Sequence, residues 1–419
     1  MILSNNMKDL FALSIPLGCR YVDKFFQKPE YDHLVTFAQN KTTPVYNWLY
    51  YKEGFSRDLV WDLLEDFKAT AGATVLDPFC GTGTTLLACN EVGLNSIGFD
   101  VLPLGVFASK TKLQRDYDMN KLRDAISWLM SEKFGETSSR MVDVRFIDMR
   151  KAFSRYARND LMFFRDRIMR VEDESIRNFL LLGLVSIVTE ASNTKKDGGV
   201  IRIVSKRHLP PVRELLKRRL KRMFKDLDDV KRTDASADVY LGDARSLTLE
   251  DNSVDYCITS PPYLNYVDYT KLYALELSML LKNSEELSNL RKKTMRSHVG
   301  AEYHKTENVR SEDFERMMRV LEERSPGDLP LMVRGYFEDS FLYMSELYRV
   351  MKNGGTAALV VGNACLPDVT VDVDLILGEI GEQIGFTLEK IVVANVRWCE
   401  VGSIRKERPV RESVVVLKK

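Results

Sequence analysis

The fold is decided by residues 73–83, which read ATVLDPFCGTG. A short apolar strand ends at Asp77, and a loop with two glycines leads into a helix over residues 84–92. A second apolar strand, residues 96–100, again ends on an aspartate. This strand–loop–helix–strand order predicts a doubly wound α/β sheet, whose ligands bind beyond the carboxyl ends of the strands.

The same pattern resumes in the second half of the chain. Residues 238–243 and 254–259 predict two more buried strands, and residues 356–361 predict another one after a helix that stops at a glycine pair. Residues 389–396 and 412–417 predict a final strand pair joined by a basic loop. The expected sheet is therefore mostly parallel and closes with a C-terminal antiparallel hairpin.

The segment between the two halves has a different periodicity. Apolar residues in 212–227 recur at helical spacing, and most of 118–235 reads as helix. We therefore predict one catalytic α/β domain that is interrupted by a helical insertion. The predicted divisions are an N-terminal segment at 1–43, the catalytic domain at 44–117 and 236–419, the insertion at 118–235, and a variable region at 270–330.

Composition is that of an ordinary soluble globular protein, with a formal net charge of +1 over 419 residues. No apolar run approaches the length of a membrane span, and the first 17 residues lack the pattern of a secretory signal. Six scattered cysteines form no C-x-x-C, and four scattered histidines do not favour zinc, so no metal site is predicted. A reducing, cytoplasmic setting is expected.

The glycine loop is a candidate cofactor site. Two glycines allow the backbone to approach a ligand closely, and Asp100 ends the next strand, where an acid can hold both hydroxyls of a ribose. The alternative is a simple glycine turn with a surface aspartate. A nicotinamide cofactor is disfavoured because the spacing is not G-x-G-x-x-G. The candidate residues are Asp77, Pro78, Phe79, Gly81, Thr82, Gly83 and Asp100.

Two further strand ends carry residues suited to binding a purine or pyrimidine. Asp243, followed by Ala244, ends the third strand and is a candidate acceptor for an adenine amino group, although a turn aspartate is the alternative. The next strand leads into Ser260-Pro261-Pro262-Tyr263. The prolines lack N–H groups, so their carbonyls are free to accept, while serine adds a hydroxyl and tyrosine a flat face. This set suits a planar ring with an exocyclic amino group.

These motifs together resemble the class I S-adenosylmethionine-dependent amino-methyltransferases of DNA. The loop 77–83 is similar to their cofactor loop, Asp100 to their ribose-binding acid, and Asp243 to their adenine-contacting acid. Residues 260–263 resemble their catalytic motif, and 44–59 the segment that completes the cofactor pocket. The resemblance covers roughly 44–115 and 236–419, and implies a Rossmann-like class I methyltransferase fold with S-adenosylmethionine as cofactor.

The resemblance also implies a reaction. Serine at the first motif position is commonest in enzymes that methylate N4 of cytosine, so a site-specific DNA methyltransferase acting on a base flipped from duplex DNA is expected, with a restriction endonuclease as a candidate companion. Adenine N6 is the first alternative. RNA or protein amino-methyltransferases are a further one, but they usually carry Asp or Asn in place of Ser260. Because the chain has no Pro-Cys pair, methylation at cytosine C5 is excluded.

Basic residues gather in three places, which suggests a surface for DNA. Residues 202–232 contain twelve Lys/Arg against four Asp/Glu, a local net of +8, although a single basic helix is often only a solvated face. The insertion and the 270–330 region are therefore candidates for DNA contact and target recognition. The second cluster supplies the DNA-binding candidates Arg291, Lys292, Lys293 and Arg296. The third, in the loop of the last strand pair, supplies Arg405, Lys406 and Arg408 and also contains Arg397 and Arg411.

Overall fold

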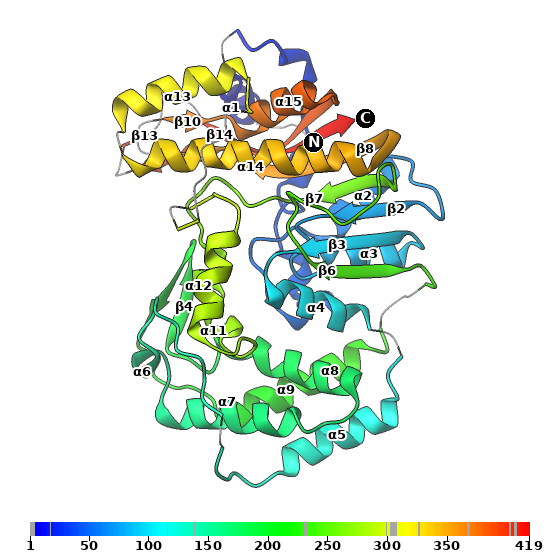
Figure 1. Cartoon of the computed structure of the whole chain (residues 1–419), viewed down its shortest axis with the longest axis vertical. Coiled ribbons are helices and arrows are strands. Elements are labelled where there is room, and N and C mark those ends of the chain that lie inside the picture. Colours follow the sequence, from blue (N-terminus) through cyan, green and yellow to red (C-terminus); the bar gives the residue numbers. More distant parts are fainter. Residues whose placement is uncertain are drawn as a thin grey trace.

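The computed structural model describes residues 5–419 except 17, 115, 138, 230–232, 299, 302–307, 326, 367–368, 402–403 and 406–408. Within these residues the centre of the molecule is an eight-stranded sheet (Figure 1). Its strands, in spatial order, are β1 (Phe25–Gln27), β11 (Thr387–Arg397), β14 (Val410–Lys418), β8 (Met351–Gly362), β7 (Val254–Thr259), β2 (Thr74–Asp77), β3 (Asn95–Asp100) and β6 (Ala237–Leu241).

The pairing of the strands confirms the predicted fold class. β2, β3, β6, β7 and β8 are parallel neighbours, whereas β14 runs antiparallel to both β8 and β11. In the final hairpin, β14 therefore lies between β8 and β11, and only the short strand β1 lies outside β11. The outermost strand β1, which pairs parallel with β11, was not foreseen from the sequence.

Alternate residues of the central strands point to opposite layers of helices, as a pleated strand requires. Val75 and Ile258 pack toward α2 and α3, while Leu76 and Cys257 pack toward α14 and α15. Because both faces are covered, apolar residues point to both sides in the middle of these strands. The covering helices are α2 (Arg57–Asp66), α3 (Thr84–Glu91), α14 (Asp328–Val350) and α15 (Val373–Ile384), with α4 (Pro103–Leu113) beside β3 and β6.

Local signals in the sequence explain where several of these helices begin. The Ser56 hydroxyl accepts a hydrogen bond from the Leu59 backbone N–H at 3.4 Å, so Ser56 is the N-cap of α2. Gly83 immediately precedes α3 with a φ of 83°, a conformation that favours glycine. α14 begins at Asp328, and the buried residues within 328–335 continue the buried face of the rest of the helix.

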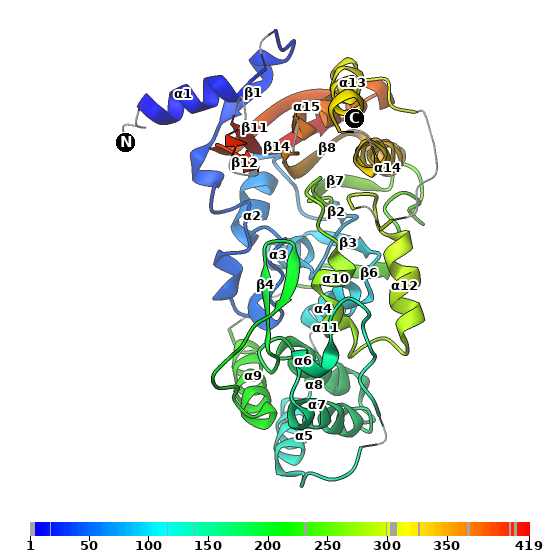
Figure 2. The same ribbon diagram turned by 90° about the vertical axis from the view of Figure 1, so that its left-hand side faces the viewer.

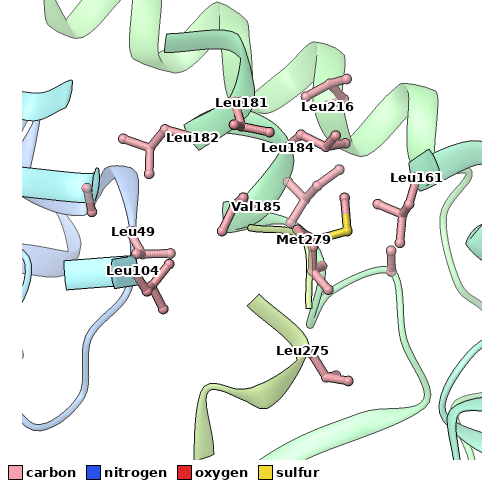
Figure 3. Packing of buried hydrophobic residues seen from close by; sticks show 14 of the residues in the cluster. Leu49, Leu104, Leu161, Leu181, Leu182, Leu184, Val185, Leu216, Leu275 and Met279 are labelled. Atoms are coloured by element: carbon pink, nitrogen blue, oxygen red, sulfur yellow. The ribbon is translucent and has the colours of Figure 1, made fainter. Parts of the chain in front are cut away.

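The insertion forms a second, largely helical layer below the sheet domain (Figure 1). Its core is shared with the catalytic part: Figure 3 shows leucines of the insertion converging with Leu49 and Leu104 from outside it. Leu104 lies on α4 and is fully buried, as is Leu182 on α8. The elements of the insertion are α5 (Met119–Ser131), α6 (Met149–Ala152), α7 (Arg155–Ile168), α8 (Glu174–Ser186), β4 (Thr194–Asp197), β5 (Val200–Ile203) and α9 (Val212–Asp226).

The antiparallel hairpin β4–β5 departs from the helical pattern predicted for this segment. Gly198 forms its turn with a φ of 58°, and Gly199 and the β-branched residues of β5 follow. A glycine pair followed by β-branched residues is a hairpin signal. This hairpin signal is short, and the strongly periodic helical segments on either side mask it when periodicity is judged over a longer window of residues.

The 270–330 region is also helical and packs against the sheet domain and the insertion. Its helices are α10 (Tyr269–Leu272), α11 (Ala274–Leu277), α12 (Ser284–Lys293) and α13 (Glu312–Arg324), while α1 (Asn5–Ser14) packs near β11 at the N-terminal end. Among the described helices, none combines the length and the apolar character needed to cross a bilayer. Cys365 and Cys399 form a disulfide bond, a pair that their 34-residue separation does not indicate.

Candidate active site

A cavity of about 990 Å³, including the solvent at its mouth, opens beyond the carboxyl ends of β2, β3, β6 and β7. This is the position expected for the ligand of a doubly wound sheet. The lining includes Tyr51, Glu53, Gly54, Phe55, Asp77, Pro78, Phe79, Cys80, Gly81, Thr82, Asp100, Gly242, Asp243, Ala244, Arg245, Ser260, Pro262, Tyr269, Lys293, Thr294, Met295, Ser297 and His298.

Asp77 holds the start of the glycine loop against two neighbouring elements. Its carboxylate accepts hydrogen bonds from the Thr85 hydroxyl on α3 at 2.7 Å and from the Thr259 hydroxyl on β7 at 2.6 Å. Burial raises the pKa of Asp77 from 3.8 to about 6, while the hydroxyl donors oppose that rise. The residue therefore fixes β2, α3 and the end of β7 to one another in the floor of the cavity.

The two glycines of the loop meet a real steric requirement. Gly81 and Gly83 have φ values of 49° and 83°, and a Cβ on Gly83 would lie 2.9 Å from the Ser109 hydroxyl oxygen. Gly81 lines the cavity, whereas Gly83 lies behind it at the start of α3. A Cβ on Gly105 of α4 would lie only 2.7 Å from the Gly81 carbonyl oxygen, so α4 packs directly on the loop.

Asp100 lies on the opposite side of the glycine loop. Its carboxylate accepts from the backbone N–H of Gly81 at 2.8 Å and from that of Leu102 at 2.7 Å. Burial raises the pKa of Asp100 from 3.8 to about 6, although the two backbone donors favour the charged form. The side chain lines the cavity, and each oxygen keeps a further lone pair for a ligand hydroxyl.

Asp243 also lines the cavity but already has a cationic partner. Arg245 binds it through two nitrogens, with the closest Nη2–Oδ2 distance at 2.7 Å, and reaches the buried Asp339 at 3.0 Å. The Arg245 guanidinium therefore holds Asp243 in one orientation. Ala244 next to it is buried in the same wall.

Ser260 and Pro262 line the cavity next to the glycine loop, and Pro261 is buried behind them. The Ser260 hydroxyl donates to the Val360 carbonyl on β8 at 3.0 Å. Its single hydrogen is thus directed away from the cavity, and its oxygen remains an acceptor. One cavity thus contains the glycine loop, Asp100, Asp243 and Ser260. These residues are separated by up to 183 positions in the sequence.

Tyr263 is placed differently from the other residues of its motif. It is not among the lining residues of the cavity. Its ring lies against Gly362 at the end of β8, where a Cβ would be 2.9 Å away, and its hydroxyl donates to Glu412 on β14 at 3.2 Å. Burial raises the pKa of Tyr263 well above its ordinary value, and the neighbouring Glu412 carboxylate adds to the effect.

The cavity contains residues that the sequence did not single out. Glu53 is a carboxylate in the wall that accepts from the Tyr273 hydroxyl at 2.5 Å, and burial raises its pKa. Tyr51 stacks on Tyr273 with ring centres 4.6 Å apart and also contacts Gly81. Tyr51 and Glu53 belong to the segment 44–59, which was expected to complete the cofactor pocket although no residue in it was named. Tyr273 follows the catalytic motif, and only its long-range packing places it here.

The segment after α12 forms the remaining wall of the cavity. His298 is buried beside Thr294, whose hydroxyl lies 2.9 Å from the His298 Nε2. Burial lowers the pKa of His298. Lys293 is exposed and lines the cavity mouth. Part of the predicted variable region thus belongs to the cavity itself.

The second basic cluster is not a uniform exposed surface, in contrast to the prediction. Lys292 and Lys293 are exposed. Arg296 is 6% exposed and pairs with Asp339 at 2.7 Å, and Arg291 pairs with Asp268 at 2.5 Å. The buried arginine is held inside because a carboxylate from α14 compensates its charge.

The third basic cluster lies mainly outside the described residues. Arg405 belongs to a short strand, β13 (Ile404–Arg405), but its side chain is not described, and Lys406 and Arg408 fall outside the described chain. Arg411, counted in the same cluster, is fully buried and pairs with Asp374 at 2.7 Å. It therefore anchors β14 to α15 and is not part of a surface.

Comparison with known proteins identifies the family. The N6/N4 family profile, described as DNA methylase, matches residues 23–103. The type II methyltransferase M.BsoBI of Geobacillus stearothermophilus is 31% identical over 87% of this chain and 83% of its own length. The chain belongs to the S-adenosylmethionine-dependent DNA amino-methyltransferases. This methyltransferase is also 28% identical to the type II methyltransferase M.AvaI of Nostoc, over 86% of this chain and 83% of the relative.

A solved S-adenosylmethionine-dependent methyltransferase from Methanosarcina mazei aligns with a TM-score of 0.30 and 9% identity, covering 85% of this chain and 96% of that one. Because this TM-score is low, the structural similarity does not contribute to the family assignment. Family membership makes S-adenosylmethionine the cofactor and DNA the substrate of this methyltransferase. The cavity fits that cofactor, because it combines a glycine loop of positive φ with the carboxylates of the buried Asp100 and the half-buried Glu53.

Proposed function

We propose that this methyltransferase methylates the exocyclic N4 of cytosine at a specific sequence in duplex DNA, by direct transfer to a flipped base. The observation that carries the proposal is the Ser260 hydroxyl, which donates to the Val360 carbonyl at 3.0 Å and offers its oxygen to the cavity. An acceptor in that position suits an amino group, which has hydrogens to donate. The neighbouring glycine loop supports binding of the methyl donor beside it.

The position of each side chain supports the proposed cofactor-binding roles. We propose that Asp100 holds the ribose hydroxyls and that Asp243 and Ala244 contact the adenine. The loop residues Asp77, Pro78, Phe79, Gly81 and Thr82 then shape the floor, and Gly83 keeps α3 close behind it. Glu53 adds a half-buried carboxylate, which favours a cationic ligand such as this cofactor. When bound, S-adenosylmethionine supplies a methyl group activated by a sulfonium centre.

The chemistry of the protein side chains is positioning. Ser260 and the Pro261 carbonyl accept the two amino hydrogens, which favours a tetrahedral nitrogen with its lone pair directed at the methyl carbon. Serine is a weak base, so the proton leaves to solvent after transfer, and no covalent intermediate with the protein forms. Flipping the base costs a few kcal/mol of unstacking, and stacking on Tyr263 is proposed to offset part of that cost.

The choice of cytosine over adenine rests on Ser260 alone, through its resemblance to the cytosine-specific members of the family. The test is incubation of the protein with unmethylated plasmid and labelled S-adenosylmethionine, followed by mass spectrometry of the nucleosides. N4-methylcytosine is the expected product. N6-methyladenine would overturn the base assignment, and an unlabelled plasmid carrying many different sequences would overturn the proposed activity.

Ser260→Ala tests the role of the hydroxyl in the same assay. Losing a hydrogen bond of about 1.5–3 kcal/mol to a group that becomes charged lowers the methylation rate by roughly 10- to 100-fold. Cofactor affinity, measured by calorimetry, should stay within a factor of about two because the hydroxyl contacts the base. An equal fall in methylation rate and cofactor affinity would show that Ser260 shapes the cavity rather than binding the amino group.

A further inference from the structure

The β4–β5 hairpin links the insertion to the catalytic loop. Figure 2 shows it rising from the helical layer to the level of the sheet. At its tip, a Cβ on Gly199 would lie 2.4 Å from Cγ2 of Val267, which follows the Ser-Pro-Pro-Tyr motif in the chain. Backbone atoms of the hairpin therefore contact the loop that leads from Tyr263 to α10, whose first residue, Tyr269, lines the cavity.

One face of the hairpin is anchored by a buried charge. Lys196 pairs with Glu276 of α11 at 2.8 Å, with side chains only 11% and 6% exposed. The same ammonium lies 3.6 Å from the centre of the Tyr273 ring. Because Tyr273 in turn donates to Glu53 in the cavity wall, the position of the hairpin relative to the cavity is fixed.

The other face of the hairpin is exposed, and its charged side chains are arranged unfavourably in the absence of a binding partner. Lys195 and Arg202 are directly opposite one another across the two strands, and both are exposed. Like charges at directly opposed positions destabilise an antiparallel pair. Asp197 offsets them only in part, with its carboxylate 3.6 Å from Arg202. Beside this pair, Val200 exposes 48% of its surface.

We propose that this face of the β4–β5 hairpin binds the duplex next to the flipped base, with Lys195 and Arg202 on phosphates and Val200 against base edges in the groove. The basic pair is complementary to a polyanion, and a two-stranded β-ribbon fits the major groove. The inference rests on the proposed function, because it takes duplex DNA with a base in the cavity as the partner. It assigns a target-contacting role within the insertion, beside the catalytic motif.

The test compares two double variants that each remove two positive charges from the insertion. Lys195→Ser/Arg202→Ser removes the hairpin pair, and Lys121→Ser/Arg123→Ser removes an exposed pair from α5, at the far end of the insertion in Figure 1. DNA affinity is measured against salt concentration for each. The hairpin variant should flatten the slope of log K against log salt by about 1.8, at 0.9 per lost phosphate contact, and the α5 variant should not change it.

Cofactor affinity and methylation of the same duplex complete the experiment. Both variants should bind S-adenosylmethionine like the wild type, and the hairpin variant should lose methylation efficiency at least tenfold. Wild-type methylation with an unchanged slope and rate in the hairpin variant would overturn the hairpin's role while leaving the proposed function intact. A wild-type protein that methylates no duplex would instead overturn the proposed function, and the hairpin inference with it.

Val200→Ser separates the groove contact from the phosphate contacts. An apolar contact releases no counterions, so the salt slope should stay that of the wild type while methylation efficiency falls severalfold. An unchanged efficiency would remove Val200 from the interface. The hydroxyl-bearing variant is compatible with this exposed strand position, since Val200 is largely in solvent already.

Discussion

Gly362 has a specific partner in the site, the ring of Tyr263. The backbone there does not require glycine, because Gly362 is not among the residues of positive φ. The constraint is instead the tyrosine ring, 2.9 Å from where a Cβ would lie. The end of β8 therefore provides a flat bed on which the last residue of the catalytic motif rests.

Gly362→Ala should displace the Tyr263 ring and lower methylation by about tenfold, equivalent to roughly 1.4 kcal/mol of lost positioning. Gly135→Ala is the matched control, because nothing lies within 4 Å of its Cβ position. Both are measured as kcat/KM on the same duplex. Equal rates for the two variants would mean that the observed ring position does not matter for the reaction.

Asp100 gives cofactor binding a pH dependence. Its pKa of about 6 in the folded protein lies above the 3.8 of an exposed aspartate. Between pH 4 and pH 6 the Asp100 carboxyl is protonated in the folded state but not in the unfolded state. Its contribution to the stability of the fold therefore decreases as pH rises through this range. The charged form, which accepts best from ribose hydroxyls, is complete only above pH 6.

Affinity for S-adenosylmethionine should therefore fall about tenfold between pH 7 and pH 5, one pH unit below the pKa costing one factor of ten. Asp100→Asn should bind weakly at both pH values and lose this dependence. Asp77 has a similar pKa of about 6, so Asp77→Asn serves as the control and should retain it. Calorimetry at the two pH values distinguishes the carboxyls, and a dependence that follows Asp77 would reassign the effect.

At the scale of elements, α4 is tied to the glycine loop by a buried lysine. Lys112 is 2% exposed, and its ammonium donates to the Tyr46 carbonyl at 3.2 Å and the Thr82 carbonyl at 3.1 Å. Burial lowers its pKa from 10.5 to about 7. A neutral amine still has two hydrogens for these two carbonyls, so loss of the charge does not break the contacts.

Because the unfolded chain keeps the Lys112 proton up to about pH 10.5, wild-type stability should rise with pH above 7. Relative to Lys112→Met, the wild type should gain about 2 kcal/mol between pH 7 and pH 9. Urea unfolding at the two pH values measures this gain. Lys110→Met, an exposed position on the same helix, is the control. The absence of any relative gain over Lys112→Met would mean that this amine is charged throughout.

Regular elements with a clear period were predictable, and the residues at their ends followed from them. Asp77, Asp100, Asp243 and Ser260 were found because each follows a short apolar strand, and parallel strands present their carboxyl ends at one edge. Arg296 and Arg411 were misread as surface cations because their partners, Asp339 and Asp374, lie 43 and 37 residues away. No local pattern indicates a compensating charge at that distance.

The individual residues in the remaining part of the site could not be predicted for a similar reason, although the 44–59 segment was expected to complete the cofactor pocket. Glu53 and His298 enter the cavity through the packing of the 44–59 and 270–330 segments on the sheet domain. The β4–β5 hairpin, in contrast, had a local signal at its glycine pair. Its charge pattern gains meaning only when the structure places it against the loop after the catalytic motif.

At the scale of the whole molecule, the insertion and the sheet domain share one hydrophobic core. Leu104 of α4 is fully buried in the same cluster as the leucines of α8 (Figure 3). Val106 on the same helix belongs to another cluster, with Cys80 and Val239 on the sheet side. The two faces of α4 therefore connect different parts of the molecule.

Leu104→Ala should lower the free energy of unfolding by about 2–5 kcal/mol, since it leaves a cavity in a packed core. If the shared core makes one cooperative unit, hydrogen exchange should accelerate in α8 as well as in α4. Val106→Ala removes a smaller side chain from the sheet-facing side, and at matched loss of stability it should accelerate exchange around β6 more than in α8. Exchange in α8 that keeps its wild-type rate in Leu104→Ala would show that the insertion is stable independently of the core it shares with the sheet domain.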